Sequence, residues 1–359
     1  MSLSAKVQAV LDQVCYDQDL IRFYGAEFRV NAHHIIETPF STVFRLDSSN
    51  QDASFKLYLK TLCDSSDQAK ARASIQNEYD IMSRLSQQFE RVKMLDVPHP
   101  VKLYADSASL LTEEVEGSEL ENLLTGAARL FGRTSVKAAV HMTELAGVWL
   151  REFQQMTADQ ETSVSFQPLA LYCQERVEYL LKHHAPGVTD SLNKAFVHLA
   201  KVAEDEGMPH SVFTAGCHGD FAPHNMITNK ERLAVIDFTD YRMDCSLFDP
   251  INFLEKVGRM HNHFFYRSSF VDQLQSAFLK GYGLLVPEVT QSACYRLIRA
   301  RCVLLRLFHY FMCRTRSWRM RIGHDVAYRE SLAELHALLG SHQPSVLKQS
   351  LKRTGMKPQ

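Results

Sequence analysis

Apolar and polar residues alternate in short runs over the first third of the chain, and then follow a helical spacing over most of the remainder. The clearest alternating run is 54–62, where Phe55, Leu57 and Leu59 are separated by more polar residues. A two-residue period predicts a strand with one buried face. Other extended runs are expected at 27–30, 35–36, 42–46, 101–104 and 110–115.

Elsewhere apolar residues recur every three or four positions, which is the spacing of a helix with one buried stripe. One helix is expected over 1–24, ahead of the strands, and another over 69–89, between them. Further helices are expected at 135–156, 169–183 and 188–206, and the last hundred residues also look helical. We therefore predict an α+β protein whose strand-rich first part precedes a larger helical part.

One polar stretch interrupts this pattern, the sequence CHGDFAPHN at 217–225. Asp220 and Asn225 lie in it among turn-forming residues, and Asp237 closes the strand-like run 233–236 that follows. Phosphoryl transfer from a nucleoside triphosphate needs an aspartate at the attacking hydroxyl, and an asparagine and a second aspartate that hold Mg²⁺. The order and spacing of the three residues predict this chemistry.

Two other interpretations fit parts of the stretch. Asp220 and Asn225 are residue types that favour turns and caps, but this explains neither their order nor the Asp237 that follows. Two histidines and two aspartates could instead ligate zinc or a pair of metal ions: His218, Asp220, His224 and Asp237. A zinc site would leave Asn225 without a role.

The motif His218-x-Asp220-x-x-x-x-Asn225, then Asp237-Phe238 with threonine in place of a final glycine, resembles the kinase motifs H-R-D-x-x-x-x-N and D-F-G. In this form it resembles the aminoglycoside phosphotransferase and choline kinase group, the small-molecule branch of the protein-kinase-like fold. The resemblance implies that Asp220 takes the proton of the attacking hydroxyl and that His218 braces its loop. It also implies that Asn225 and Asp237 ligate Mg²⁺.

The same resemblance implies a two-lobed α+β fold with a small antiparallel sheet in the N-lobe and a larger, mainly helical C-lobe. We expect a leading helix at 1–24, the nucleotide-binding N-lobe at 25–116, the helical lobe with the catalytic and metal loops at 117–340, and a basic tail at 341–359. Adenine would meet backbone groups of the linker at 113–120.

A kinase-like site also needs a lysine on the third strand that contacts phosphate, and a glutamate on the next helix that holds this lysine. Lys60 and Glu78 match these places, and Lys56 on the same strand face is the competing lysine. A solvent-facing lysine and a surface glutamate are the common alternatives for such residues. Their order ahead of the central motif favours the functional interpretation.

The chain departs from the kinase pattern because no glycine occurs between Gly25 and Gly117. A glycine-rich phosphate loop is therefore missing, and side chains limit how closely a backbone approaches phosphate. The first strand turn offers hydroxyl and N–H groups instead, from Thr38, Ser41 and Thr42. We expect ATP as the nucleotide, with GTP as the alternative. A non-catalytic nucleotide-binding scaffold protein is the alternative function.

The acceptor is expected to be a small hydroxylated molecule, since only about a dozen residues separate Asp237 from Asp249-Pro250. That leaves no room for the activation segment that seats a peptide in protein kinases. Asp249 is expected to cap a helix that starts at Pro250. Nine arginines against one acid between 296 and 329 favour a neutral to anionic acceptor. Peripheral membrane contact is a second interpretation of this segment, and a solvated helix face that pairs with acids elsewhere in the chain is the third.

Composition adds little beyond this. The formal net charge is −1, and no nucleic-acid partner is expected. Eight cysteines without a C-x-x-C pair indicate free thiols in a reducing compartment. Residues 1–6 have no apolar signal core, and no long apolar run predicts a membrane span. A cytoplasmic location is expected.

Overall fold

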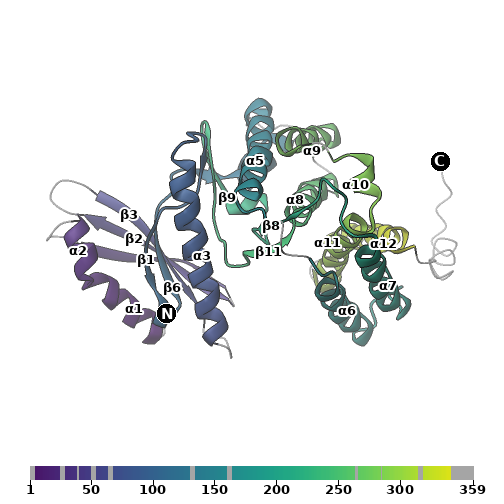
Figure 1. Cartoon of the computed structure of the whole chain (residues 1–359), viewed down its shortest axis with the longest axis horizontal. Helices are drawn as coiled ribbons and strands as arrows, with labels where there is room; N and C mark the ends of the chain where they lie inside the picture. The colour runs from purple at the N-terminus through teal and green to yellow at the C-terminus, as the bar shows by residue number, and fades with distance from the viewer. Residues whose placement is uncertain are drawn as a thin grey trace. The chain divides into compact units, whose positions relative to one another are not determined.

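The computed structural model describes residues 5–24, 29–38, 40–49, 54–63, 68–129, 134–159, 164–262, 266–283, 285–313 and 318–340 (Figure 1). The expected basic tail at 341–359 lies outside these residues. The chain divides into two compact units. Unit 1 comprises 1–127, 132–149 and 218–242, and unit 2 comprises 128–131, 150–217 and 243–359.

Unit 1 contains a five-stranded antiparallel sheet in the order β1-β2-β3-β6-β5. The strands are β1 (Arg29–Glu37), β2 (Ser41–Ser49), β3 (Ser54–Leu62), β5 (Pro100–Tyr104) and β6 (Ser109–Glu113). Alternate residues such as Phe44, Leu46, Leu57 and Leu59 are buried on one face. They pack against the helices α1 (Ala5–Cys15) and α2 (Gln18–Tyr24), which lie along this face (Figure 1). The opposite face carries the intervening side chains, Lys60 among them.

The leading segment forms two helices, whereas the sequence predicted one helix over 1–24. Asp17 separates them, because its carboxylate accepts hydrogen bonds from the backbone N–H groups of Asp19 (3.0 Å) and Leu20 (3.3 Å) and so caps α2. Lys102 and the Tyr104 hydroxyl, both on β5, bind the same carboxylate at 2.8 Å and 3.0 Å. The cap therefore also fastens the helices to the sheet.

A second sheet of unit 1 has the order β4-β10-β9-β7. It is formed by β4 (Leu95–Asp96), β7 (Ser118–Glu119), β9 (Met226–Asn229) and β10 (Arg232–Val235). β9 and β10 form a hairpin in which Met226 pairs with Val235. The helix α3 (Gln68–Phe89) follows β3, close to the predicted bounds, and α4 (Leu120–Ala128) follows β7.

An aromatic cluster joins the two halves of the central motif. The indole of Trp149, on α5 (Val136–Met156), is fully buried and stacks on Phe221 with ring centroids 5.8 Å apart. It also packs against Phe238 at 6.1 Å and Phe89 at 5.5 Å, and its N–H donates to the Asp96 carbonyl at 3.0 Å. Phe221 follows Asp220 and Phe238 follows Asp237, so one side chain supports both loops.

We expect Trp149→Ala to lower the free energy of unfolding by about 3–5 kcal/mol, because it removes a large buried ring and one hydrogen bond. Trp149→Phe keeps much of the packing and should cost markedly less. Urea unfolding followed by circular dichroism measures both. Equal stabilities of the alanine variant and the wild type would show that the cluster does not stabilise the fold.

Unit 2 is mainly helical (Figure 1). Its helices are α6 (Gln167–Lys182), α7 (Ser191–Glu206), α8 (Phe248–Gly258), α9 (Ser268–Tyr282), α10 (Pro287–Gln291), α11 (Ala293–Met312) and α12 (Trp318–Leu339). A two-stranded sheet of β8 (Thr214–Cys217) and β11 (Arg242–Cys245) accompanies them. α8 begins at Phe248, so the prediction that Asp249 caps a helix starting at Pro250 is wrong. Asp249 lies within the first turn, fully buried.

Four of the nine arginines between 296 and 329 are engaged inside unit 2. Arg306 and Arg299 form ion pairs with Glu255 on α8 (3.1 Å and 3.5 Å) and also pair with Glu334 on α12. The two remaining members of this set are Arg296, which donates to the Leu338 carbonyl at 2.8 Å, and Arg301, which stacks over Phe248 at 4.5 Å.

Of the other five arginines, Arg314 and Arg316 lie outside the described residues, as do the side chains of Arg319 and Arg321. Arg329 is exposed. Two of the nine arginines, Arg299 and Arg306, are therefore paired with acids that are distant in sequence. No helix in the described part of the chain has the length and apolar character needed to cross a membrane.

Candidate active site

The β9–β10 hairpin brings Asn225 and Asp237 together, because one residue immediately precedes β9 and the other closely follows β10. The pairing extends one step beyond the strands, since the Ile236 N–H donates to the Asn225 carbonyl at 3.0 Å. Asp237 has a φ of +68°, a left-handed conformation that non-glycine residues seldom adopt. Such strain persists only where neighbouring contacts hold it.

His218 connects this hairpin to the loop that carries Asp220. The imidazole is fully buried, and its Nε2 lies 2.9 Å from the Ile236 carbonyl. Nδ1 accepts the Asp220 backbone N–H at 3.4 Å. These partners assign the Nε2–H tautomer, because a carbonyl needs a donor and an N–H needs an acceptor.

Gly219 lies where the same loop passes close to another backbone segment. Its φ is +89°, and a Cβ at this position would lie 2.6 Å from the Asp240 carbonyl oxygen. Only glycine fits such a left-handed conformation at this separation. The glycine between His218 and Asp220 is thus required by the turn.

Asp220 is held from two sides. Its Oδ2 lies 3.2 Å from His224 Nε2 and 3.4 Å from Asn225 Nδ2, and Asn225 Nδ2 also donates to the Asp220 carbonyl at 2.9 Å. The amide nitrogen of Asn225 therefore faces Asp220, which leaves its Oδ1 as the acceptor end. The side chain of Asp220 is 40% exposed, so a solvent-borne hydroxyl can reach it.

A second polar cluster surrounds Lys60. Its Nζ lies 3.0 Å from both carboxylate oxygens of Glu78 and 2.6 Å from Asp237 Oδ1, and it also donates to the Thr239 hydroxyl. Glu78 is 2% exposed. One ammonium faces two carboxylates, so the cluster carries one excess negative charge.

This cluster shifts the pKa values of its members. Burial by itself would raise the pKa of the Asp237 carboxyl, but the Lys60 ammonium and hydrogen bonds from Lys60 and Thr239 outweigh it and lower the pKa to about 2. Burial would lower the pKa of Lys60, and the charges of Glu78 and Asp237 raise it instead. Asp237 is therefore ionised, and Lys60 charged, throughout the physiological range.

The donor set fits a hard divalent cation. The Asp237 carboxylate and the Asn225 Oδ1 are oxygen ligands of the kind that Mg²⁺ prefers, and the one excess negative charge of the cluster of Lys60, Glu78 and Asp237 favours a cation. In the described part of the chain, no three His, Cys, Asp or Glu side chains form a metal-binding group. The zinc alternative therefore finds no support there.

Of the two candidate lysines, only Lys60 reaches the cluster. Lys56 lies four residues earlier on β3, where it forms an ion pair with Glu114 at 3.1 Å and is 47% exposed. We expect Lys60→Met to weaken nucleotide binding and turnover far more than Lys56→Met, by about 10²-fold or more in kcat/KM, because only Lys60 is held by Glu78. Parallel steady-state kinetics decide this, and equal losses would move the phosphate contact to Lys56.

The first strand turn differs from a phosphate-binding loop. The Thr38 hydroxyl accepts the backbone N–H groups of Phe40 (3.2 Å) and Ser41 (2.9 Å), so both amides already have a partner within the turn. Thr42 is buried. A contact of Thr38, Ser41 or Thr42 with phosphate stays a prediction. For the turn amides to bind phosphate, their hydrogen bonds to the Thr38 hydroxyl would have to be replaced by hydrogen bonds to phosphate oxygens.

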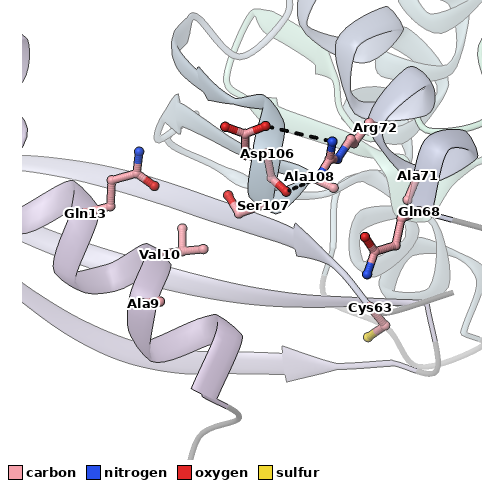
Figure 2. A pocket seen from close by; sticks show the side chains of 10 residues that line it. All are labelled: Ala9, Val10, Gln13, Cys63, Gln68, Ala71, Arg72, Asp106, Ser107 and Ala108. Carbon is pink, nitrogen blue, oxygen red and sulfur yellow. Dashed lines mark hydrogen bonds and ion pairs between the residues drawn. The ribbon is translucent and has the colours of Figure 1, made fainter.

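Described residues of unit 1 line at least two cavities. The larger, about 460 Å³, lies between α1, the start of α3 and the 105–107 turn, and contains no residue of the central motif (Figure 2). The smaller, about 260 Å³, is lined by 113–116 and by Ile227, next to Asn225-Met226. Glu113 and Glu114 use their N–H groups within the fold, bonding to His99 and Lys56 carbonyls at 2.9 Å each.

Sequence reasoning missed three residues of this site. Thr239 binds the Lys60 cluster through its hydroxyl, Ser74 binds the Thr239 carbonyl, and Trp149 supports both loops. Thr239 was visible only as a departure from the final glycine of the kinase motif. Ser74 and Trp149 gave no signal, because their partners lie far away in sequence.

Comparison with known proteins bears on the family and the fold of the chain. A model of the phosphotransferase enzyme family (APH) matches residues 39–292. None of the curated proteins compared with the chain matches it. The likeness to solved structures, at 11–16% identity, concerns the fold.

Three solved structures illustrate the likeness. The ADP-bound aminoglycoside phosphotransferase APH(2'')-Ib is 16% identical, with a TM-score of 0.53 and coverage of 94% of this chain and 99% of that one. A choline/ethanolamine kinase family protein from Mesorhizobium loti is 12% identical, with a TM-score of 0.53 and coverage of 93% and 99%. An ethanolamine kinase from Plasmodium vivax is 11% identical, with a TM-score of 0.55 and coverage of 90% and 87%.

These likenesses confirm the predicted protein-kinase-like α+β fold. The family match also confirms the resemblance to the aminoglycoside phosphotransferase and choline kinase group. Because the matched region, 39–292, spans most of the sequence, we conclude that the chain belongs to the phosphotransferase enzyme family.

Proposed function

We propose that the protein transfers the γ-phosphoryl group of ATP to a hydroxyl group of a small molecule. The observation that carries this proposal is the assembly of two polar clusters within one unit. One cluster consists of Asp220, His224 and Asn225, and the other of Lys60, Glu78, Asp237 and Thr239. The hairpin contact between Asn225 and Ile236 joins them.

Each residue then has a role in the proposed reaction. Asp220 orients the attacking hydroxyl and accepts its proton, and His218 braces the Asp220 loop through the Ile236 carbonyl. Lys60, held by Glu78, contacts the phosphates of the nucleotide. If the Lys60 ammonium donated to a phosphate of the nucleotide instead of to Asp237, the Asp237 carboxylate would be free to bind the metal.

Asn225 Oδ1 and Asp237 would hold Mg²⁺, which supplies charge neutralisation of the triphosphate when bound. Catalysis by the chain itself then consists of positioning and of electrostatic complementarity, the two largest contributions expected for phosphoryl transfer. We place the base of the nucleotide beside residues 113–116, where the smaller cavity lies. ATP is proposed as the donor, with GTP as the alternative.

The acceptor is proposed to be a small hydroxylated molecule, by analogy with the aminoglycosides and ethanolamine named for the related structures. The arginine-rich segment says less about the charge of the acceptor than its arginine count suggested. Four arginines of the basic segment are engaged internally, and the remaining support for a neutral to anionic acceptor comes from Arg329 and from arginines outside the described residues. A cytoplasmic location fits a nucleotide-dependent reaction and stays part of the proposal.

A non-catalytic nucleotide-binding protein is the second candidate. The observation in its favour is the first strand turn, where Thr38 already occupies the amides that would meet phosphate. The Asp220 cluster argues against it, because a scaffold needs no residue at the attacking hydroxyl.

One experiment tests the proposal. Thermal unfolding is measured with Mg²⁺–ATP and Mg²⁺–GTP, and release of ADP or GDP is then measured with a panel of cationic amino alcohols, aminoglycosides, neutral sugars and sugar phosphates. We expect nucleotide-dependent stabilisation that requires Mg²⁺, and turnover with at least one acceptor class. Stabilisation without turnover on any acceptor would favour the scaffold. Absence of both would overturn the proposal.

A further inference from the structure

Thr239 follows Asp237-Phe238 directly, and its carbonyl and hydroxyl groups bind helix α3 and the Lys60 cluster. Its carbonyl accepts a hydrogen bond from the Ser74 hydroxyl at 2.7 Å. Its own hydroxyl lies 2.6 Å from Asp237 Oδ1 and 3.2 Å from Glu78 Oε2, and accepts from Lys60. Its side chain therefore bridges the helix and the metal-binding carboxylate.

Two residues of the segment 237–239, Phe238 and Thr239, are hydrogen-bonded to α3. Ser74 and Glu78 are four residues apart, so they project from the same helix face. Ser74 binds the Thr239 carbonyl, while Glu78 Oε1 accepts the Phe238 backbone N–H at 3.1 Å. The Phe238 ring is fully buried against Trp149 and His218.

The hydroxyl of Thr239 can donate only one proton, and the shorter contact gives it to Asp237 Oδ1. Lys60 donates to the hydroxyl oxygen from the other side. The Thr239 hydroxyl thus links the Asp237 carboxylate to Lys60 and Glu78, so that the positions of the three side chains depend on one another. Through this bond it also helps to hold Asp237, whose left-handed backbone conformation persists only where neighbouring contacts support it.

We propose that Thr239 and Ser74 are positioning residues that fasten the Asp237 segment to α3, so that the metal-binding carboxylate and the Lys60–Glu78 pair adopt their working geometry together. The inference rests on the proposed function for the roles of Asp237 and Lys60. It goes beyond that function because it assigns roles to two residues outside the metal and phosphate contacts. A glycine in place of Thr239 would provide only the carbonyl.

The test uses three variants and one matched control in the full chain. Thr239→Val removes the hydroxyl at nearly constant volume, Thr239→Ser keeps it, and Ser74→Ala removes the bond to the Thr239 carbonyl. Ser83→Ala is the control, because Ser83 is also on α3 but its hydroxyl bonds only to the Tyr79 carbonyl of the same helix, at 2.8 Å.

The first readout needs no nucleotide. Amide hydrogen exchange is measured across 236–241 and α3, where the Phe238 N–H is expected to be protected by Glu78. Thr239→Val and Ser74→Ala should each speed exchange of the 237–239 segment, whereas Thr239→Ser and Ser83→Ala should resemble the wild type. Unchanged exchange in both Thr239→Val and Ser74→Ala would overturn the tether, whatever reaction the protein catalyses.

The second readout is the Mg²⁺ concentration that gives half-maximal nucleotide binding. Thr239→Val should raise it about tenfold, as expected for loss of a hydrogen bond to a charged group, and Ser74→Ala about threefold. In the double variant, the fold-increase in this Mg²⁺ concentration should be smaller than the product of the two single-variant increases, because both hydrogen bonds act on one segment.

The two proposals can fail separately. Faster exchange with an unchanged Mg²⁺ requirement would overturn the positioning role. A wild type without Mg²⁺-dependent nucleotide binding would overturn the proposed function and the positioning role with it, while the exchange measurement would still decide whether the tether exists.

Discussion

Replacement of Asp237 by asparagine is expected to abolish stabilisation of the protein by Mg²⁺ and nucleotide while leaving the fold intact. The carboxylate is ionised at neutral pH, because Lys60 and Thr239 hold its pKa at about 2. An amide of the same shape offers one neutral oxygen to a cation that prefers anionic oxygen. Lys60 keeps its pair with Glu78 at 3.0 Å, so no buried charge loses its partner.

Thermal unfolding with and without Mg²⁺–ATP measures this effect. In the wild type, a nucleotide at about 100 times its Kd stabilises the native state by about 2.7 kcal/mol, and the midpoint of unfolding rises accordingly. We expect no such rise in Asp237→Asn. Asp240→Asn is the matched control, since Asp240 is an exposed acid three residues further along the same loop. Equal nucleotide affinity in Asp237→Asn and the wild type would remove Asp237 from the metal site.

Replacement of Asp220 by asparagine should leave nucleotide binding within about twofold and reduce turnover of the acceptor by about 10²–10⁴-fold. The backbone contact with Asn225 does not use the carboxylate, so the loop is expected to keep its shape. What is lost is the base at the attacking hydroxyl. Steady-state kinetics with the best acceptor of the panel, together with nucleotide titration, separate the two effects.

His224 is the rival base in this assay, because its Nε2 lies 3.2 Å from Asp220 Oδ2. His224→Gln retains a donor to that oxygen but no group of useful basicity. We expect this variant to keep most of its turnover if Asp220 is the base. A large loss of turnover in His224→Gln, together with a small loss in Asp220→Asn, would identify His224 as the base in place of Asp220.

The fold could be predicted largely from periodicity, because hydrophobic spacing is local information. The run at 54–62 is β3 (Ser54–Leu62), and the stripe at 69–89 is α3 (Gln68–Phe89). Errors arose where a single polar side chain decides a boundary. Asp17 ends one helix and caps the next, and the polar residues of 31–34 did not prevent β1 from running without interruption from Arg29 to Glu37.

The candidate site was predictable where its residues are close in sequence or follow a known order. Asp220 and Asn225 are five residues apart, and Lys60 and Glu78 precede them in the order of a kinase. Spacing could not rank Lys60 above Lys56, since that choice depends on contact with a carboxylate 177 residues away. For the same reason spacing could not identify the partners of Arg299 and Arg306, because Glu255 and Glu334 lie on other helices.

The indole beneath the two motif loops gives the protein an intrinsic optical reporter. The sequence contains two tryptophans, and Trp149 is the one that touches both Phe221 and Phe238. Its emission therefore responds to any rearrangement that separates the two loops or lets water between them. In a Trp318→Phe background it would be the sole tryptophan, so tryptophan emission follows the Asp220 and Asp237 loops as one signal without an added label.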